Sequence, residues 1–494
     1  MRGKSHIVLH GLIGCSLLGV SMACAQPVSS NRHQSPGGST EETLSPAGPP
    51  TMQRGHRWVR SHPFTIMGLT RMTPRPFDAD QYREANMSAL LAWEPSTFDD
   101  LLPIASANRL PYHLYLDHWG DEQTNRDDAS EESLREALGE LDSEENRAYI
   151  RNLMSNPGCI GWLVNDEPVV STYMRYTRHM LKWLRQLNPE ALAYCNARPE
   201  GEMLLGADYE RYIDDFAAII DPDVLMVDVY PLGDLEDVDG WVHAESYFKV
   251  LEVVRHVALE QGMPYWLFIQ SFETHNGWHR RLPSESDIRF QLFTPLTYGY
   301  TGIAYFTYDI AFERGLLESD GQPNRLYHHA AQANTEVANL GTALRYLTST
   351  DVRFVRGQQG EGSSRVANPI PRGATAWSYG AGNDHQITDV AVESSGEYKD
   401  GLLGLFTDDR GERYFMLTNL WHDKGGTAEE FELTFTVRFK PQVSELYRLN
   451  RLSGNVETVE VIGGALTVRL PGGTGDLFRY TPGPFPGRSA DGQY

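Results

Sequence analysis

The chain has 494 residues, a formal net charge of -23 at pH 7 and 40% hydrophobic residues. This length predicts two domains and allows a large apolar core. The acidic balance argues against nucleic acid and anionic membrane surfaces as partners, because both attract basic faces. The sequence contains no Gly-rich phosphate loop, no Cys-x-x-Cys pair and no zinc-type ligand spacing. We therefore predict neither a cofactor nor a metal.

The first 25 residues have the organisation of a secretory signal peptide. Two basic residues precede an apolar core over residues 7–22, and a small-residue cleavage site ends at Ala25. Cleavage there predicts a secreted or periplasmic protein. The alternative is a lipoprotein anchored at Cys24, although Ser21 stands where bacterial lipoproteins usually carry leucine. No later stretch is apolar for long enough to span a bilayer.

Two cysteines, Cys159 and Cys195, remain after signal removal. A pair of thiols in a secreted chain suggests a disulfide. The expected strands place them about four residues apart along the barrel, which is ~13 Å at 3.3 Å per residue. That separation is too long for a bridge. We expect both to be buried small hydrophobic residues.

Residues 26–56 are rich in Pro, Ser, Gly and Gln, which predicts a disordered leader. Over residues 57–347 apolar strand candidates alternate with helical segments, of which the clearest runs from Ser171 to Asn188. Eight strands with intervening helices over about 290 residues predict an α/β fold, the (β/α)8 TIM barrel, with an open doubly wound sheet as the alternative. The expected strands are 64–69, 88–93, 112–117, 160–165, 192–196, 224–229, 264–270 and 302–308.

From residue 350 onward the helical period gives way to alternating apolar and polar residues separated by Gly, Asp and Asn turns. This pattern predicts a C-terminal antiparallel β-sandwich over 350–482, followed by a frayed tail over 483–494. We expect Phe435, Val437 and Phe439 to pack inside the sandwich and one sandwich edge to dock on the barrel. The alternating runs are 402–406, 414–417, 431–439, 443–449 and 465–470.

The most informative segment is an apolar run between Gly161 and Pro168 that ends in Asn165, Asp166 and Glu167. The run predicts a buried strand. In a parallel barrel the C-terminal ends of the strands carry the catalytic groups. The alternative is an acidic turn before the next helix, where carboxylates are favourable without any catalytic role.

Seven of the expected strands end in polar or aromatic side chains, and in a closed barrel these ends converge. Aromatic rings stack on sugar rings, and amides and acids bind hydroxyls. Two facing carboxyl groups could supply a general acid with a nucleophile or base. Each candidate also has a structural interpretation, as a turn residue, a helix-start acid or an oriented hydrogen bonder. The catalytic candidates are Glu167, Glu273 and Asp228, and the substrate-binding candidates are Trp93, Glu94, Asp117, His118, Trp119, Asn165, Asp166, Asn196, Arg198, Tyr230, Gln270, Trp278 and Asp309.

These motifs resemble the clan-A glycoside hydrolases, retaining glycosidases with an Asn-Glu pair after strand 4 and a second Glu after strand 7. They are more closely similar to a poorly characterised bacterial group of glycosidase-like barrels. The shared motifs are Asp166–Pro168, Asp228–Pro231, Gln270–Phe272 and Gly302–Tyr305. The resemblance covers residues 60–345 and implies a secreted hydrolase of O-glycosidic bonds, with carbohydrate as its partner and Glu167 as the proton donor.

The chain departs from the clan-A pattern at strand 7, where Gln270 stands in the position of the nucleophilic Glu. Three options follow. Glu273, three residues later, reaches back as the nucleophile. Asp228 or Asp309 acts as the base of an inverting mechanism. In the third option the barrel binds sugar without cleaving it.

Two further classes of function stay open. One is a non-catalytic carbohydrate-binding protein on a degenerate glycosidase barrel, which would bind without turnover. The other is a polysaccharide lyase or deacetylase that uses His118 and Tyr230, and a lyase would leave an unsaturated chromophore in its product. For the glycosidase, the pKa of Glu167 has to be raised, and the like-charged neighbour Asp166 could raise it.

Overall fold

The computed structural model describes residues 52–72, 76–201, 207–233, 238–275, 279–357, 369–393 and 399–488. The signal peptide, the Cys24 anchor, most of the predicted leader and Trp278 lie outside the described residues, and these stay predictions. The first element, helix α1 (Arg54–Ser61), begins inside the predicted leader. Its Trp58 and Val59 are buried with apolar residues of the barrel strands, which explains why order begins there.

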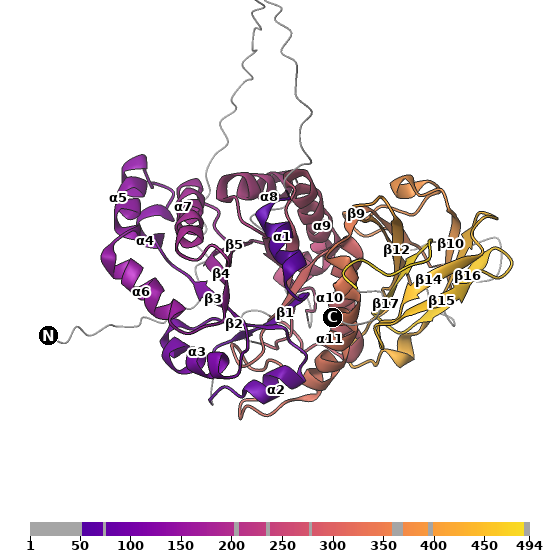
Figure 1. The fold of residues 1–494 in the computed structure, drawn as a ribbon, viewed down its shortest axis with the longest axis horizontal. Helices are drawn as coiled ribbons and strands as arrows, with labels where there is room; N and C mark the ends of the chain where they lie inside the picture. The colour runs from indigo at the N-terminus through magenta and orange to yellow at the C-terminus, as the bar shows by residue number, and fades with distance from the viewer. Residues whose placement is uncertain are drawn as a thin grey trace, which may run out of the picture. The chain divides into compact units, whose positions relative to one another are not determined.

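Eight parallel strands form a closed barrel in sequence order, as the strand pattern predicted (Figure 1). All eight expected strands agree with the observed strands to within two residues at either end; β4 extends one residue further at its C-terminal end, to Asp166, and β6 is one residue shorter at each end. The strands are β1 (Thr65–Thr70), β2 (Ala89–Ala92), β3 (Tyr112–Leu116), β4 (Cys159–Asp166), β5 (Leu192–Ala197), β6 (Leu225–Asp228), β7 (Tyr265–Gln270) and β8 (Gly302–Phe306).

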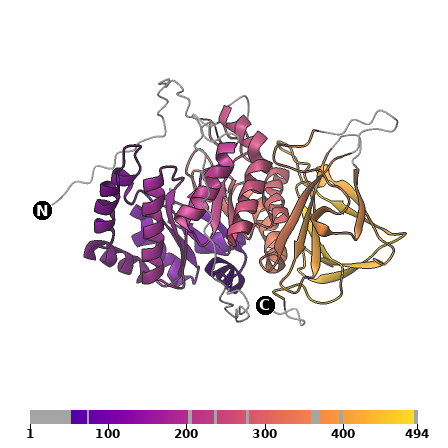
Figure 2. The same cartoon turned by 90° about the horizontal axis from the view of Figure 1, so that it is seen from above.

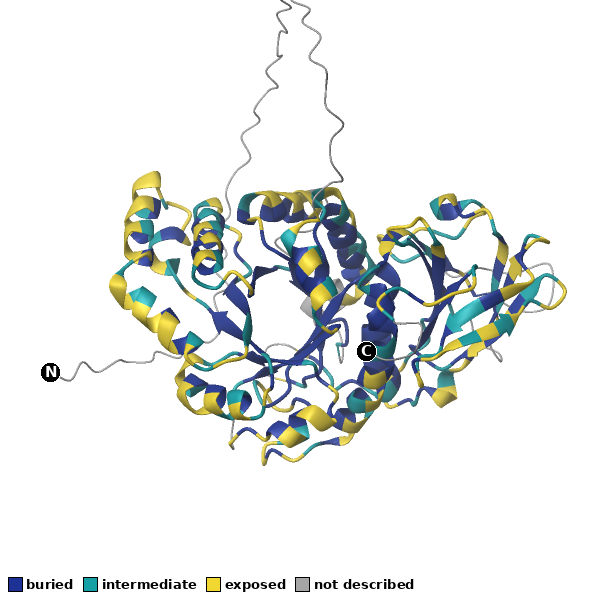
Figure 3. Ribbon diagram, in the orientation of Figure 1, coloured by how far each residue is buried: buried dark blue, intermediate teal, exposed yellow. Residues whose placement is uncertain are grey.

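Helices cover the outside of these strands (Figure 2), and most of them have one exposed and one buried face (Figure 3). In α7 (Ser171–Leu187) the spacing of Met174, Met180, Leu181 and Leu184 places all four in the core, as expected for an amphipathic helix. The other helices are α2 (Ala79–Glu84), α3 (Phe98–Ala107), α4 (Asp121–Thr124), α5 (Glu131–Leu141), α6 (Glu144–Met154), α8 (Ala207–Ile220), α9 (Val238–Gln261), α10 (Glu285–Tyr298) and α11 (Arg325–Leu344).

The C-terminal strands form two antiparallel sheets, one with the order β10-β13-β16 and one with the order β15-β14-β17-β12-β11-β9. Phe435, Val437 and Phe439 belong to the core between them, which confirms that prediction. The sequence pattern missed β9, β10, β15 and β17. The strands are β9 (Thr348–Val355), β10 (Ile387–Glu393), β11 (Gly401–Thr407), β12 (Arg413–Asn419), β13 (Leu433–Phe439), β14 (Glu445–Leu449), β15 (Val456–Glu460), β16 (Ala465–Leu470) and β17 (Gly475–Arg479).

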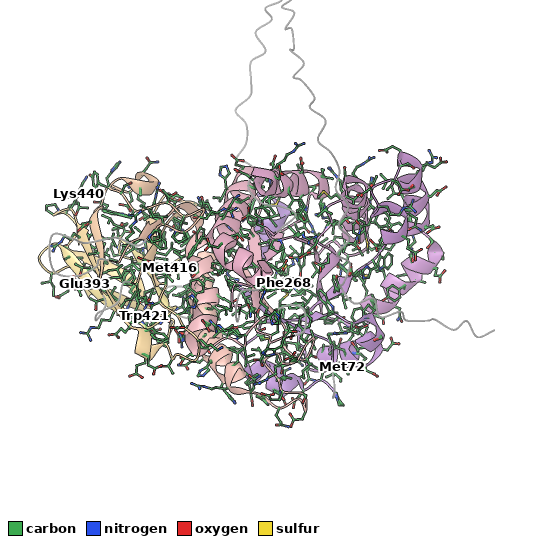
Figure 4. All side chains as sticks on the ribbon, turned by 180° about the vertical axis from the view of Figure 1, so that it is seen from behind. Met72, Phe268, Glu393, Met416, Trp421 and Lys440 are labelled. Atoms are coloured by element: carbon green, nitrogen blue, oxygen red, sulfur yellow. The ribbon has the colours of Figure 1, made fainter. Side chains whose placement is uncertain are left out.

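One face of the six-stranded sheet packs on the barrel helix α10. The prediction that an edge of the sandwich docks on the barrel was therefore wrong. Successive residues of the sheet's central strands alternate between two cores, because side chains on a strand point to opposite faces. Met416, labelled in Figure 4, joins the core that includes the barrel helices, whereas Phe415 joins the sandwich core. As a result α10 is buried from Ser286 to Tyr298.

Polar groups also join the sandwich to the barrel. Arg289 on α10 and Arg451 after β14 both bind the buried carboxylate of Glu336 on α11, each at 2.9 Å. Gly404 on β11 faces α10 closely, since a Cβ there would lie 2.3 Å from the carbonyl oxygen of Thr297. These contacts explain how one face of a sheet can approach a helix so closely.

The start of the predicted frayed tail is packed. Phe485 is fully buried against Tyr414, with a ring-centroid distance of 5.7 Å, and the Arg479 guanidinium lies 5.9 Å from its ring. Arg488 Nε donates to Thr342 Oγ1 of α11 at 3.2 Å. The burial of one aromatic side chain, Phe485, therefore orders a Pro/Gly-rich segment whose composition suggested disorder.

Candidate active site

Strand β4 ends in an irregular turn that carries the predicted acid. Asn165 and Glu167 both adopt left-handed φ values, +52° and +44°. The register between β4 and β5 shifts between Leu163 and Asp166. Non-glycine residues in this region are strained by about 1–3 kcal/mol, and such strain gathers at functional sites. The Glu167 backbone N–H donates to the Asn196 carbonyl at 3.1 Å, which holds the turn.

The side chain of Asn165 makes hydrogen bonds to other residues of the protein. Its Oδ1 accepts from the Trp119 backbone N–H at 3.2 Å, and its Nδ2 donates to Thr177 Oγ1 at 2.9 Å. The residue is fully buried. These bonds tie the loop after β3 to helix α7, so the structure gives Asn165 a positioning role.

The turn brings Asp166 and Glu167 beside carboxyl and amide groups from the next two strands. The Asn196 side-chain nitrogen donates to Asp166 Oδ1 at 3.1 Å and to Asp228 Oδ1 at 2.9 Å. Asp228 is in turn hydrogen-bonded to Glu167. Three consecutive strands, β4, β5 and β6, therefore contribute to one connected network at their C-terminal ends.

Burial and mutual repulsion raise the pKa values of the carboxyl groups in this network. Burial raises the pKa of Asp166 well above its ordinary value, and Glu167, Asp228 and Asp117 raise it further. Burial also raises the pKa of Asp228, with Glu167 as the next cause. The pKa of Glu167 is raised by burial, against the opposing effects of Arg198 and of the hydrogen bond with Asp228. A raised pKa favours the protonated form of a carboxyl group, which is the form that acts as a general acid.

Arg198 is the cation next to the acid. Its Nε lies 3.9 Å from Glu167 Oε2, and the two side chains are 37% and 33% exposed. Tyr212 on α8 holds both loops: its hydroxyl donates to the Pro168 carbonyl at 3.2 Å and accepts from the Arg198 backbone N–H at 3.0 Å. Tyr212 was missed by the sequence reasoning, because nothing in its helix marks a contact with two loops.

The groups after β3 form the other side of the network. Asp117 is hydrogen-bonded to Tyr115, and burial raises its pKa. His118 lies with Nε2 3.1 Å from Asp117 Oδ2 and Nδ1 3.6 Å from Asp121 Oδ2, and its side chain is 78% exposed. Trp93 stacks on Tyr115 with a centroid distance of 3.7 Å.

A second group of aromatic rings follows β6, β7 and β8. Tyr230 stacks on Phe306 at 5.5 Å, and Phe272 meets both rings edge-on. Phe312 lies 5.0 Å from Phe272 and is 38% exposed. Tyr230 is also hydrogen-bonded to Asp228, and burial raises its pKa. Among these rings the sequence analysis named Tyr230 as a binding candidate and Phe272 as the end of the Gln270–Phe272 motif, and Phe306 could have been found from its position at the end of β8.

Gln270 and Glu273, at the end of β7 and just after it, bind loop residues rather than the carboxyl network. Gln270 is fully buried and bonds the Leu232 backbone N–H and carbonyl, each at 3.0 Å, and the Arg281 carbonyl at 2.9 Å. The amide is therefore occupied in joining two loops. Glu273 Oε2 binds Arg314 Nε at 2.9 Å, and its Oε1 lies 3.9 Å from His275 Nε2.

Three other predicted binding residues have structural partners. Asp309 is buried, and both its oxygens accept from the Arg71 backbone N–H, at 3.0 and 2.9 Å. Glu94 lies 3.3 Å from the Arg71 guanidinium. The Trp119 ring lies 6.2 Å from the rings of Tyr149 and Trp183, within the helical layer.

Within the described ranges no group of three or more His, Cys, Asp or Glu side chains has the arrangement of a metal site. Cys159 and Cys195 are free thiols. In the same part of the chain no helix combines the length and apolar character needed to cross a membrane.

No protein-family model and no curated protein matches this chain. Solved structures share the barrel remotely. One is the β-galactosidase from the psychrophilic Marinomonas ef1, with 13% identity and a TM-score of 0.44 over 57% of this chain and 62% of that one. Another is the endo-β-1,4-mannanase from Thermotoga petrophila, with 10% identity and a TM-score of 0.39 over 83% and 97%. A third is α-L-fucosidase isoenzyme 2 from Paenibacillus thiaminolyticus, with 9% identity and a TM-score of 0.44 over 85% and 100%.

At these identities and TM-scores the similarities carry no conclusion about this chain. By its own strand order the chain is a (β/α)8 barrel followed by a β-sandwich, with a hydrogen-bonded carboxyl network at the C-terminal ends of β4, β5 and β6.

Proposed function

We propose that the protein is a secreted glycoside hydrolase in which Glu167 is the proton donor. The observation that carries the proposal is the network of Asp166, Asn196, Asp228 and Glu167. It lies where barrel enzymes place their catalytic groups. Burial there raises the pKa of Glu167, although that side chain is 33% exposed.

Asp228 acts as the partner that shares a proton with Glu167. The hydrogen bond between the two side chains lowers the pKa of Glu167 and raises that of Asp228. Asp228 therefore tunes the acid in this arrangement, and the nucleophile or base comes from another strand. Glu273 stays our candidate for it, provided that substrate displaces its ion pair with Arg314.

A non-catalytic carbohydrate-binding barrel is the second candidate. The specific observation in its favour is at β7, where Gln270 bonds backbone groups and Glu273 is paired with Arg314. The lyase alternative loses support, because a raised pKa makes Tyr230 a poor base.

The test is a screen of the purified protein against a panel of oligo- and polysaccharides, with new reducing ends as the readout. Glu167→Gln should lose at least about a hundredfold in turnover, the scale of a positioned general acid. Its thermal stability should stay close to that of the wild type. The matched control is Glu122→Gln, which removes an exposed carboxylate from the start of α4. Full activity in Glu167→Gln would refute the assignment.

The stereochemistry of cleavage tests the partner. Proton NMR of the first-formed product anomer should show retention if Glu273 is the nucleophile. Inversion would remove Glu273 from that role. Binding without new reducing ends, across the whole panel, would select the carbohydrate-binding alternative.

A further inference from the structure

The mouth of the barrel has an acidic side and an aromatic side. The carboxyl groups lie at the ends of β3, β4 and β6, whereas the rings follow β2, β6, β7 and β8. Phe306, the last residue of β8, contacts all of these rings. The centroid distances from Phe306 are 6.1 Å to Trp93, 5.5 Å to Tyr230, 5.4 Å to Phe272 and 6.0 Å to Phe312. We call Phe306 and these four side chains the aromatic wall.

Both ends of the aromatic wall are joined to the carboxyl network. At one end Tyr230 is hydrogen-bonded to Asp228. At the other end Trp93 stacks on Tyr115 at 3.7 Å, and Tyr115 is hydrogen-bonded to Asp117. Because strands β1 to β8 close in sequence order, these contacts run around the mouth of the barrel. A molecule seated in the mouth therefore meets carboxyl groups on one side and aromatic rings on the other.

Both sides of the mouth are accessible. The side chains of Asp117 and Glu167 are 20% and 33% exposed. On the aromatic side Phe312 is 38% exposed, and Trp93 and Phe306 are partly exposed. An exposed group of neighbouring apolar side chains beside a candidate site marks a surface for an apolar ligand.

The wall suits an apolar group better than a second sugar ring. Phe306 and Phe312 have no hydrogen-bonding group, so a sugar hydroxyl pressed against them would lose its bonds to water without replacement. The rings also do not form one flat surface, since the plane of Phe306 is inclined by 54° to Phe312 and by 79° to Trp93. The charged residues that follow Phe312 are Glu313 and Arg314, and each is bound to a residue of the β7 loop.

We propose that the aromatic wall binds an apolar aglycone, so that the substrate is a glycoside of an aryl or alkyl alcohol. The inference rests on the proposed glycosidase function and names the group that leaves. Glu167 gives its proton to the glycosidic oxygen, and the bond from that oxygen to the anomeric carbon breaks. The nucleophile or water bonds to the anomeric carbon, and the alcohol leaves along the wall. Tyr230 joins the two sides, because its hydroxyl bonds Asp228 and its ring stacks on Phe306.

Calorimetric titration of the full-length protein tests the wall. The probes are the methyl, hexyl and phenyl glycosides of glucose, galactose and mannose, in both anomeric forms. Each buried methylene tightens binding by up to about fourfold. For the sugar that fits, the hexyl or the phenyl glycoside should bind at least about tenfold more tightly than the methyl glycoside, with a negative heat-capacity change. A hexyl preference indicates an alkyl aglycone, and a phenyl preference indicates an aryl one.

Substitutions at the most exposed ring locate the effect. Phe312→Ala should reduce the preference for the apolar glycoside about fivefold or more, whereas Phe312→Leu should keep most of it, because an apolar side chain remains. The control Tyr379→Ala removes a ring that is 53% exposed on the sandwich and should keep the preference. Equal binding of the methyl, hexyl and phenyl glycosides, or a preference unchanged in Phe312→Ala, would overturn the proposal.

Turnover of the same glycosides and of unsubstituted oligosaccharides separates the two proposals. Cleavage of oligosaccharides without any preference for an apolar aglycone would overturn the role of the wall and leave the hydrolase standing. Preferential binding of the hexyl or phenyl glycoside without cleavage of any glycoside would support the wall and refute the hydrolase. Cleavage that favours the apolar glycoside and is lost in Glu167→Gln, while that variant keeps the binding preference, would support both.

Discussion

Asp166→Asn should stabilise the folded protein at neutral and alkaline pH. Asp166 and Asp228 each accept a hydrogen bond from the same nitrogen of Asn196, at 3.1 and 2.9 Å, so the two acceptor oxygens are at most about 6 Å apart. Two unit charges at ~6 Å repel by ~3 kcal/mol at an effective dielectric constant of ~20. An amide at position 166 keeps the acceptor for Asn196 and removes this repulsion.

The pH dependence gives the prediction its sign. In the folded protein the pKa of Asp166 is raised well above the ordinary value of 3.8. Between these two values the folded state binds more protons than the unfolded state, so its stability falls as pH rises. The variant lacks this loss. We expect a gain in the free energy of unfolding of about 1–3 kcal/mol at pH 8, and little gain below about pH 4.

Urea denaturation at several pH values, followed by fluorescence and circular dichroism, measures the difference. Asp389→Asn is the control, because its carboxylate is exposed on the sandwich and should show no pH-dependent gain. A variant that is less stable than the wild type at pH 8 would refute the reasoning. So would a gain of equal size at pH 4 and pH 8, since it would not come from charge repulsion.

Three other predictions concern single contacts. Tyr212→Phe should lose about 1–3 kcal/mol of stability and much of the turnover, because it leaves two buried backbone groups without their bridge; Tyr209→Phe is the control, whose hydroxyl has no partner among the described residues. Removing residues 350–494 exposes the buried face of α10, so the barrel should become insoluble or unstable, and a soluble folded barrel in a solubility and circular dichroism assay would contradict this. Phe485→Ala should release the C-terminal segment, detected as faster trimming by carboxypeptidase.

The periodicity of the sequence was sufficient for the barrel. Apolar runs of four to eight residues and amphipathic helices such as α7 are local patterns. The spacing of their apolar residues shows directly whether one side or both sides of the element are buried. Strand β15 escaped because none of its residues is fully buried and only two are apolar, so its place is set by pairing with β14. The packed tail also depends on one distant partner for Phe485.

The candidate site divides in the same way. The sequence by itself determined that carboxylates and amides end β4, β5 and β6, because strand ends are local features. Only the tertiary structure decided what each side chain faces: Asn165 and Gln270 turn to internal partners, while Asn196 links Asp166 to Asp228. The physical reason is that a hydrogen-bond partner depends on side-chain direction and on the left-handed turn at Glu167, and neither is encoded in residue spacing.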